Sequence, residues 1–236
     1  LAVYMTTCLL VAAAVGPFAT HAVAAVRAWR GTSDAVWTNA NNWDDTSSAP
    51  GTGDTAIFND AGNGQTTINL GGGVAISTIQ FDTSTAAAYT IGSGGVGSQT
   101  LSLDNLGAVT MSASVAANET FNANVLLGTG AAGSWTFTND STTNALLFAG
   151  AVSGGTGGSA GTVALTVNGA GATDISGTVS NGGASSLALT KSGAGTLTLS
   201  GPNTFSGQLT VQNGTLSINT INDASAAGTL GNSAAS

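Results

Sequence analysis

Two short segments near the C-terminus repeat at a nearly constant interval, and this repeat constrains the fold more than any other feature of the chain. Gly195-Thr-Leu-Thr-Leu199 recurs as Gly214-Thr-Leu-Ser-Ile218, and Leu187-Ala-Leu-Thr190 recurs at a similar interval as Gln208-Leu-Thr-Val211. Two strand-like segments that share one period of about 20 residues indicate a chain that returns to the same place on each turn, with each strand pairing in parallel with its counterpart above and below. The repeat predicts an all-β parallel β-helix, because a β-sandwich would not explain it.

The residues inside the repeat agree with such a coil. In Thr196-Leu-Thr-Leu199, alternation places the leucines in the core and the threonines toward solvent, where a β-branched side chain suits the pleat. Glycine is expected at the corners, where the backbone needs a positive φ. The predicted corner glycines are Gly193, Gly195, Gly201, Gly207 and Gly214.

The body of the chain, from about residue 66 to residue 236, has the same character. Hydrophobic residues make up 42% of the chain, which argues against disorder, and 35 glycines penalise helices throughout. Short apolar runs alternate with Gly, Asn and Ser, as in a chain of short strands with tight corners. The predicted strands are Ser77–Phe81, Tyr89–Ile91, Thr100–Leu103, Val109–Met111, Trp135–Phe137 and Thr162–Val167.

The segment 1–25 has the pattern of a secretory signal peptide. The apolar run from Leu9 to Val15 is too short to span a bilayer, which takes about 20 residues. Small residues at Ala22–Ala25 suit signal peptidase, with cleavage after Ala24 or Ala25. No basic residue precedes the run and the chain opens with Leu1, so we expect a reading frame that is truncated or mis-started at its N-terminus.

Residues 26–65 differ from the rest in being rich in tryptophan. Trp29, Trp37 and Trp43 have two competing interpretations. They could be exposed indoles that contact a glycan, or they could cover the open end of a stacked β core, whose unpaired edge otherwise invites aggregation. The second is favoured because a repeat array needs an atypical terminal unit. The first strand of this region is predicted at Thr55–Phe58, after the turn at Pro50-Gly51.

Composition excludes several classes of function. The chain has 3 Lys+Arg against 11 Asp+Glu, a net charge of −8, and the acidic balance makes a nucleic-acid partner unfavourable. The only cysteine, Cys8, and the only histidine, His21, lie in the expected signal peptide. A mature chain would therefore lack the residues of Ser-His-Asp and Cys-His catalysis, of His/Cys zinc sites and of disulfides. We expect no catalytic residue, no cofactor and no metal ligand.

The C-terminal repeat also resembles a known family. Over residues 187–218 the order of residues is similar to the autotransporter-associated β-strand repeat, also called the passenger-associated transport repeat. The residues that carry the resemblance are Lys191, Gly193, Gly195, Leu197, Leu199, Gly201, Asn203, Phe205, Gly207, Gly214 and Leu216. Asp174–Ser180 resembles the strand that leads into such repeats, and Trp37–Phe58 resembles the segment often found ahead of them in secreted bacterial proteins.

The resemblance implies a right-handed, single-stranded parallel β-helix in a secreted or surface-exposed passenger of a Gram-negative bacterium. It implies a structural or adhesive role without catalysis, repeats that assist export and folding, and an outer-membrane translocator that this chain does not contain. Candidate partners are glycans or proteins of a host or environmental surface. Asn222–Gly231 looks like the opening of another repeat, so we expect the chain to be truncated at its C-terminus.

Three local patterns could carry chemistry, and each has a plainer structural interpretation. Asp44-Asp45 could form an acid/base pair, but neighbours on a strand face opposite ways. Lys191-Ser192 could form a dyad, but the same argument applies, and the resembling repeat carries a lysine there without catalysis. Asn59–Gly64 could offer oxygen ligands to calcium, but it does not match the EF-hand loop and a turn is favoured.

Two other functions remain as alternatives. A polysaccharide-binding or polysaccharide-processing β-helix would need carboxylates gathered on one strand face. The acids to be placed are Asp82, Asp104, Glu119, Asp140 and Asp174. An ice- or surface-binding solenoid would need flat threonine arrays; Thr-x-Thr occurs at 136/138 and 196/198, but the sequence does not place these pairs in successive coils.

Overall fold

The chain folds as a β-solenoid of about six turns in a computed structural model that describes residues 24–128, 132–155, 161–220 and 228–231. The predicted signal peptide lies almost wholly outside the described residues. Within them the only helical elements are two short 3-10 turns, η1 (Ala40–Asn42) and η2 (Gly62–Gly64). In the same part of the chain, no helix is long and apolar enough to cross a membrane. The predicted all-β parallel fold is confirmed.

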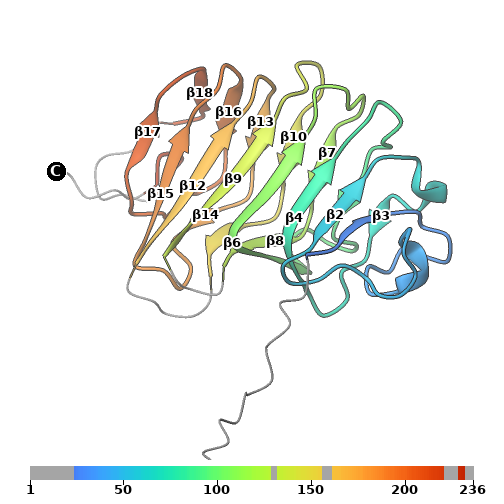
Figure 1. The fold of residues 1–236 in the computed structure, drawn as a ribbon. Coiled ribbons are helices and arrows are strands. Elements are labelled where there is room, and N and C mark those ends of the chain that lie inside the picture. Colours follow the sequence, from blue (N-terminus) through green and yellow to red (C-terminus); the bar gives the residue numbers. More distant parts are fainter. Residues whose placement is uncertain (1–23, 129–131, 156–160, 221–227, 232–236) are drawn as a thin grey trace, which may run out of the picture.

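The largest wall of the solenoid is a ladder of eight strands (Figure 1). Every pairing in it is parallel, so each coil adds its strand to the edge left by the coil before. We call this the main ladder. Its order is β1 (Val26–Ala28), β2 (Thr55–Phe58), β4 (Val74–Phe81), β6 (Thr100–Met111), β9 (Gly133–Asn139), β12 (Thr162–Asn168), β15 (Ser186–Lys191) and β17 (Leu209–Val211).

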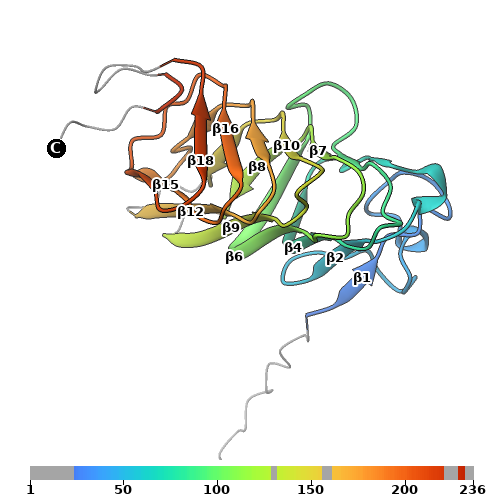
Figure 2. The same ribbon diagram turned by 90° about the horizontal axis from the view of Figure 1, so that it is seen from above.

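A second parallel ladder of seven strands faces the first across the core (Figure 2). Its order is β3 (Thr67–Ile68), β5 (Thr90–Ile91), β7 (Glu119–Phe121), β10 (Leu146–Phe148), β13 (Thr173–Ile175), β16 (Thr196–Leu199) and β18 (Thr215–Ile218). A short third ladder joins the first half of β6 and consists of β8 (Asn124–Leu127), β11 (Val152–Gly154) and β14 (Val179–Ser180).

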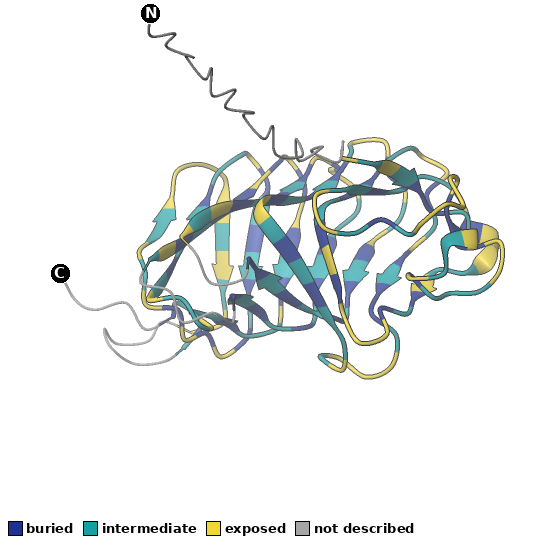
Figure 3. Ribbon diagram, turned by 60° about the horizontal axis from the view of Figure 1, so that its bottom comes forward, coloured by how far each residue is buried: buried dark blue, intermediate teal, exposed yellow. Residues whose placement is uncertain are grey.

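The core forms because strands alternate between buried and partly exposed residues, which Figure 3 shows along each ladder. In β16 both leucines, Leu197 and Leu199, are fully buried, while the two threonines remain partly exposed, as predicted. Aromatic rings continue the core from coil to coil, with centroids 5.5 Å apart in Phe58–Phe81 and 4.8 Å apart in Phe121–Phe148. The interior is thus one hydrophobic column along the solenoid axis.

The coils differ in length, and the expected period holds only for the last ones. There Leu189 pairs with Leu209 and Leu197 pairs with Leu216, which are the steps that the sequence repeat predicts. In the earlier coils the register partners lie farther apart along the chain, as in Leu165–Leu189, Trp135–Leu165, Val109–Phe137, Ile79–Val109 and Ala56–Ile79. A constant short period is therefore wrong for the earlier coils.

One source of extra length is a bulge in β6. The sequence predicted two strands, Thr100–Leu103 and Val109–Met111, where the structure has one strand that pairs with β4 along both halves. The register shifts between Ile76 and Thr78, so that four residues of β6 face a single residue of β4. Beyond the bulge, β6 leaves the third ladder and continues in the main ladder.

Candidate functional site

The residues of the C-terminal repeat come together in the last two coils, on β15 to β18 (Figure 1). Lys191 ends β15 with its side chain inside the solenoid and 1% exposed. Its ammonium donates hydrogen bonds to the carbonyl oxygens of Ser192, of Gly193 at 2.9 Å and of Asn213 at 3.4 Å. Ser192 and Gly193 form the corner of one coil and Asn213 forms the corner of the next, so one buried cation joins two successive coils.

The lysine corner is a hydrogen-bonded link between two coils. Burial lowers the pKa of Lys191 from its ordinary value, while the three carbonyl oxygens supply the negative dipoles that a buried ammonium requires. The hydroxyl of Ser192 contacts Asn168 at 3.4 Å instead of the ammonium. The two neighbours therefore do not form a dyad.

Gly193 and Gly214 have positive φ values of 71° and 74°, as predicted for corners. Gly195, Gly201 and Gly207 do not, and the prediction of positive φ is wrong for them. They are glycines because a Cβ atom would collide with the backbone of the preceding coil. Its distance to the carbonyl oxygen would be 1.9 Å to Gly171 for Gly195, 2.4 Å to Gly177 for Gly201 and 2.3 Å to Leu187 for Gly207.

Asn203 and Phe205 hold the third corner of the repeat, and both are fully buried. The Asn203 side chain accepts a hydrogen bond from the Val179 N–H at 2.7 Å in the coil before. It donates through Nδ2 to the Thr229 carbonyl at 2.9 Å in the segment after. One amide thus satisfies backbone groups of both neighbours, and the ring of Phe205 fills the core beside it.

The repeat ends at an edge that is less covered than the rest of the core. Leu216 and Ile218 on β18 are only half-buried, whereas Leu197 and Leu199, one coil earlier in the same register, are fully buried. On the main ladder, Val211 is 48% exposed. Among the described residues, the inward side chains of the last coil therefore pack against the preceding coil and are not covered by a following one.

The opposite end of the core is covered by the tryptophan region. Trp29, Trp37 and Trp43 are at most 1% exposed and pack edge-to-face around Trp43, with centroids 5.0 Å and 4.9 Å apart. All three rings contact Phe58. Their indole N–H groups donate to the carbonyls of Gln65, Pro50 and Trp37. The interpretation as exposed glycan-binding indoles is wrong, and the interpretation as a cap over the core fits this cluster.

The tryptophan region also takes part in the solenoid itself. Its strands β1 and β2 are the first two of the main ladder, and β2 pairs with β4 beyond residue 65. Asp44 and Asp45 are not an acid/base pair: Asp44 accepts from the Ala28 N–H at 3.0 Å, and Asp45 forms an ion pair with Arg27. Hydrogen bonds from Arg27 and Ser47 hold the pKa of Asp45 down at about 2.

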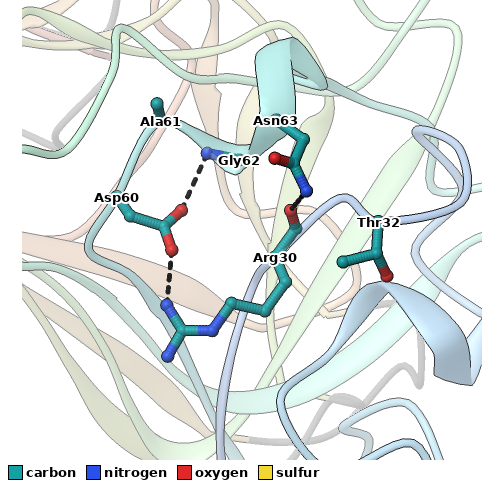
Figure 4. Close-up of a pocket in the computed structure, with 6 residues that line it drawn as sticks. All are labelled: Arg30, Thr32, Asp60, Ala61, Gly62 and Asn63. Atoms are coloured by element: carbon teal, nitrogen blue, oxygen red, sulfur yellow. Dashed lines mark hydrogen bonds and ion pairs between the residues drawn. The ribbon is translucent and has the colours of Figure 1, made fainter.

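Within the loop Asn59–Gly64, the four residues from Asp60 to Asn63 line a shallow pocket of about 390 Å³ together with Arg30 and Thr32 (Figure 4). Asp60 points at Arg30 and forms an ion pair with it, and its other oxygen accepts from the Gly62 N–H at 2.7 Å. These contacts occupy the carboxylate that a calcium ion would need. In the described part of the chain, no group of three or more His, Cys, Asp or Glu residues is placed to hold a metal ion.

Glu119 is the only fully buried acid among the described residues. It shares the inner face of β7 with Phe121 and is fully buried. Its Oε2 accepts from the Tyr89 N–H at 2.9 Å, and its Oε1 has no partner among the described residues. Burial raises its pKa to about 8, and burial also raises the pKa of Tyr89. The alternation Glu-Thr-Phe was a signal that could have placed Glu119 inward.

A parallel β-solenoid with a covered N-terminal end and a coil-joining repeat at the other end fits a passenger-type β-helix. Comparison with family models gives a match at residues 189–218 to the passenger-associated-transport-repeat, the segment that Lys191, Gly193, Asn203 and Gly214 organise. The resemblance seen in the sequence is thereby confirmed for this segment. Comparisons with curated proteins and with solved structures gave no match.

Proposed function

We propose that this chain is a β-helical passenger of the autotransporter type, exported by a signal peptide at residues 1–25 and displayed at the surface of a Gram-negative cell. In this proposal it serves as a structural or adhesive rod and catalyses no reaction. The observation that carries the proposal is the match at residues 189–218, located in the last coils, where each corner is shaped by the coil before it. A surface made of strands and neutral hydroxyl side chains suits an extended rod.

The repeat is proposed to assist export because each of the last coils, once folded, supplies the contacts on which the neighbouring coil folds. Lys191, Asn203 and the corner glycines all connect one coil to the next, so the segment gains most of its contacts when a whole coil is in place. Such nearest-neighbour coupling lets a solenoid grow coil by coil in one direction. Growth of this kind on the outer face of the membrane would keep the emerging chain from sliding back.

Two matched glycines allow the export role to be separated from stability. Gly195 lies inside the repeat and a Cβ there would approach the Gly171 carbonyl oxygen to 1.9 Å; Gly171 lies outside it and a Cβ there would approach the Ser141 carbonyl oxygen to 2.1 Å. Gly195→Val and Gly171→Val are expected to lower the melting temperature similarly. Surface display in a Gram-negative host, measured by protease accessibility, should fall more for Gly195→Val. Equal loss of display in the two variants would contradict a specific role in export.

The signal peptide has its own test. The N-terminal sequence of the exported protein should begin at Ala25 or Val26. A protein that retains residues 9–15 after export would contradict cleavage.

A further inference from the structure

The outer face of the main ladder carries a single row of threonines in register. Strand pairing aligns one residue from each of seven successive strands, β2, β4, β6, β9, β12, β15 and β17, and six of the seven are threonine. We call this row the threonine ladder; it consists of Thr55, Thr78, Ala108, Thr136, Thr166, Thr190 and Thr210. With strands roughly 4.8 Å apart, the row is about 30 Å long.

The sequence did not reveal this row because the coils differ in length. The expectation that Thr-x-Thr pairs do not fall in successive coils is confirmed for the pair at 136/138, and what the register aligns is single threonines, one from each strand. Thr136 and Thr138 on β9 stand in register with Ala108 and Thr110 on β6. On the other side they stand in register with Thr166 and Asn168 on β12. Register and not sequence spacing brings these side chains together.

The surroundings of the ladder carry no aromatic ring and one nearby carboxylate. The outward neighbours taken from the strand register are neutral; they are Ile57, Gln80, Thr110, Thr138, Asn168, Ser134, Ala164 and Ala188. In the β6 bulge that precedes Ala108, Leu106 is 76% exposed and the Asp104 carboxylate accepts a hydrogen bond from the Gly53 N–H at 2.7 Å. Every aromatic residue in the described part of the chain is buried: Trp29, Trp37, Trp43, Trp135, Tyr89, Phe58, Phe81, Phe121, Phe137, Phe148 and Phe205. The corresponding outward row of the second ladder is interrupted by Leu147 and Asp174.

The hydroxyls of the ladder are available to a ligand. All six threonines are partly exposed, and within the described residues none of their hydroxyls forms a hydrogen bond with protein. Thr162 and Ser186, at the start of the same strands, do pair with each other, at 3.0 Å. Because threonine is stiff at χ1 and the strands are fixed in the sheet, the methyl and hydroxyl groups are held in place before any ligand arrives.

We propose that the threonine ladder is a binding face for ice. The partner must be uncharged and periodic along the ladder, since the residues of the row are neutral and repeat at the strand spacing. A neutral polysaccharide is also rich in hydroxyls, but its sugar rings would find no aromatic ring to stack on here. Water molecules bonded to regularly spaced hydroxyls, with methyl groups between them, form an ordered layer that joins the surface of an ice crystal. Each such bond contributes little by itself because it replaces a bond to liquid water, so a long ladder is needed.

Threonine also favours β-strands and stabilises cross-strand pairs, so the row could be purely structural. The test must therefore separate an effect on folding from an effect on binding. Thr136→Tyr and Thr166→Tyr place a large side chain on the middle of the ladder. Thr198→Tyr is the matched control, since Thr198 is an outward, partly exposed threonine in the middle of β16 on the second ladder. Circular dichroism and thermal melting are measured for all three variants, which are expected to fold like the wild type.

The measurements are partition of the purified full chain into slowly growing ice and inhibition of ice recrystallisation. Enrichment of the wild type and of Thr198→Tyr in the ice, with loss of enrichment in Thr136→Tyr and Thr166→Tyr, would support the proposal. A wild type that stays in the liquid like serum albumin would overturn it. Equal loss in the control would overturn the assignment to this face. Binding to insoluble cellulose in place of ice, abolished by the same two substitutions, would also overturn it in favour of a neutral polysaccharide.

Discussion

The ammonium of Lys191 donates a hydrogen bond to the carbonyl oxygen of Asn213, 22 residues further along the chain and one coil higher in the solenoid. The same ammonium holds the corner of its own coil through Ser192 and Gly193. A single side chain thus couples the last coil to the body.

Replacing Lys191 should therefore loosen the last coil. Lys191→Met keeps much of the side-chain volume but removes the charged donor of these hydrogen bonds, and a hydrogen bond to a charged group contributes about 1.5–3 kcal/mol. Urea unfolding should show a loss of stability of about 2 kcal/mol or more. Hydrogen exchange should speed up first in β17 and β18.

The control for this lysine is Arg30, whose ion pair with Asp60 is about one-third exposed on both sides. Arg30→Met should change the free energy of unfolding by less than about 1 kcal/mol. Equal effects of the two substitutions would show that Lys191 is not a special link between coils.

The buried acid Glu119 should make the protein less stable as the pH rises. Its pKa is about 8 in the folded chain and 4.5 in the unfolded one, because burial disfavours the carboxylate. The stabilisation is full below pH 4.5, where both states are protonated, and is lost as the pH rises through 8. Melting temperatures between pH 5 and pH 9 should fall for the wild type.

The variant Glu119→Gln replaces the ionisable carboxyl group with a neutral amide, whose oxygen can still accept the hydrogen bond from the Tyr89 N–H. Its melting temperature should fall less over the same pH range and should exceed that of the wild type at pH 9. Asp174, whose pKa burial also raises, contributes with the same sign, so Asp174→Asn serves as the comparison. An unchanged pH dependence in Glu119→Gln would contradict the assignment.

Close approach of the backbone at the corners predicts that Gly207→Val impairs folding. A Cβ atom at this position would lie 2.3 Å from the Leu187 carbonyl oxygen, so the coils would have to separate. Gly214→Val should have a similar effect because of its positive φ of 74°. Gly72→Ala, where a Cβ would have no atom within 4 Å, should leave the melting temperature nearly unchanged. Melting of both valine variants at the wild-type temperature would contradict the account of the corners.

The tryptophan cluster should stabilise the end of the core without contacting sugars. Trp43→Ala removes the ring on which Trp29 and Trp37 pack and should cost about 3–5 kcal/mol. Soluble oligosaccharides should leave the intrinsic tryptophan fluorescence of the wild type unchanged, since the described indoles are buried. Quenching or a spectral shift at saturating sugar would contradict burial of the cluster.

The strands could be predicted from the sequence where polar and apolar residues alternate clearly, but the register between coils could not be predicted from alternation alone. Thr55–Phe58 was predicted with the boundaries that the structure has, and in Thr196–Leu199 the inward leucines and outward threonines were predicted, since both segments alternate clearly. The coil-to-coil register was predictable only where coils are short and equal. The bulge in β6 and the longer corners hid the threonine ladder.

The roles of individual residues were less predictable than the strands. Gly195 and Gly207 were expected at corners, but the reason for glycine is the backbone of another coil, which no local pattern describes. The tryptophans were recognised as unusual, yet only packing against Phe58 decided between a cap and an exposed surface. Lys191 was identified by its place in the repeat, and its carbonyl partners emerged only from the folded corner.

Disulfide cross-linking of the main ladder tests the parallel register most directly, because the only natural cysteine, Cys8, lies in the predicted signal peptide. Thr166 and Thr190 are register partners on β12 and β15, with outward side chains at a spacing within reach of a disulfide. The double variant Thr166→Cys/Thr190→Cys should oxidise to a cross-linked monomer that migrates faster on a non-reducing gel. Thr166→Cys/Thr210→Cys, two coils apart, should not. Cross-linking of the second pair and not the first would contradict the solenoid.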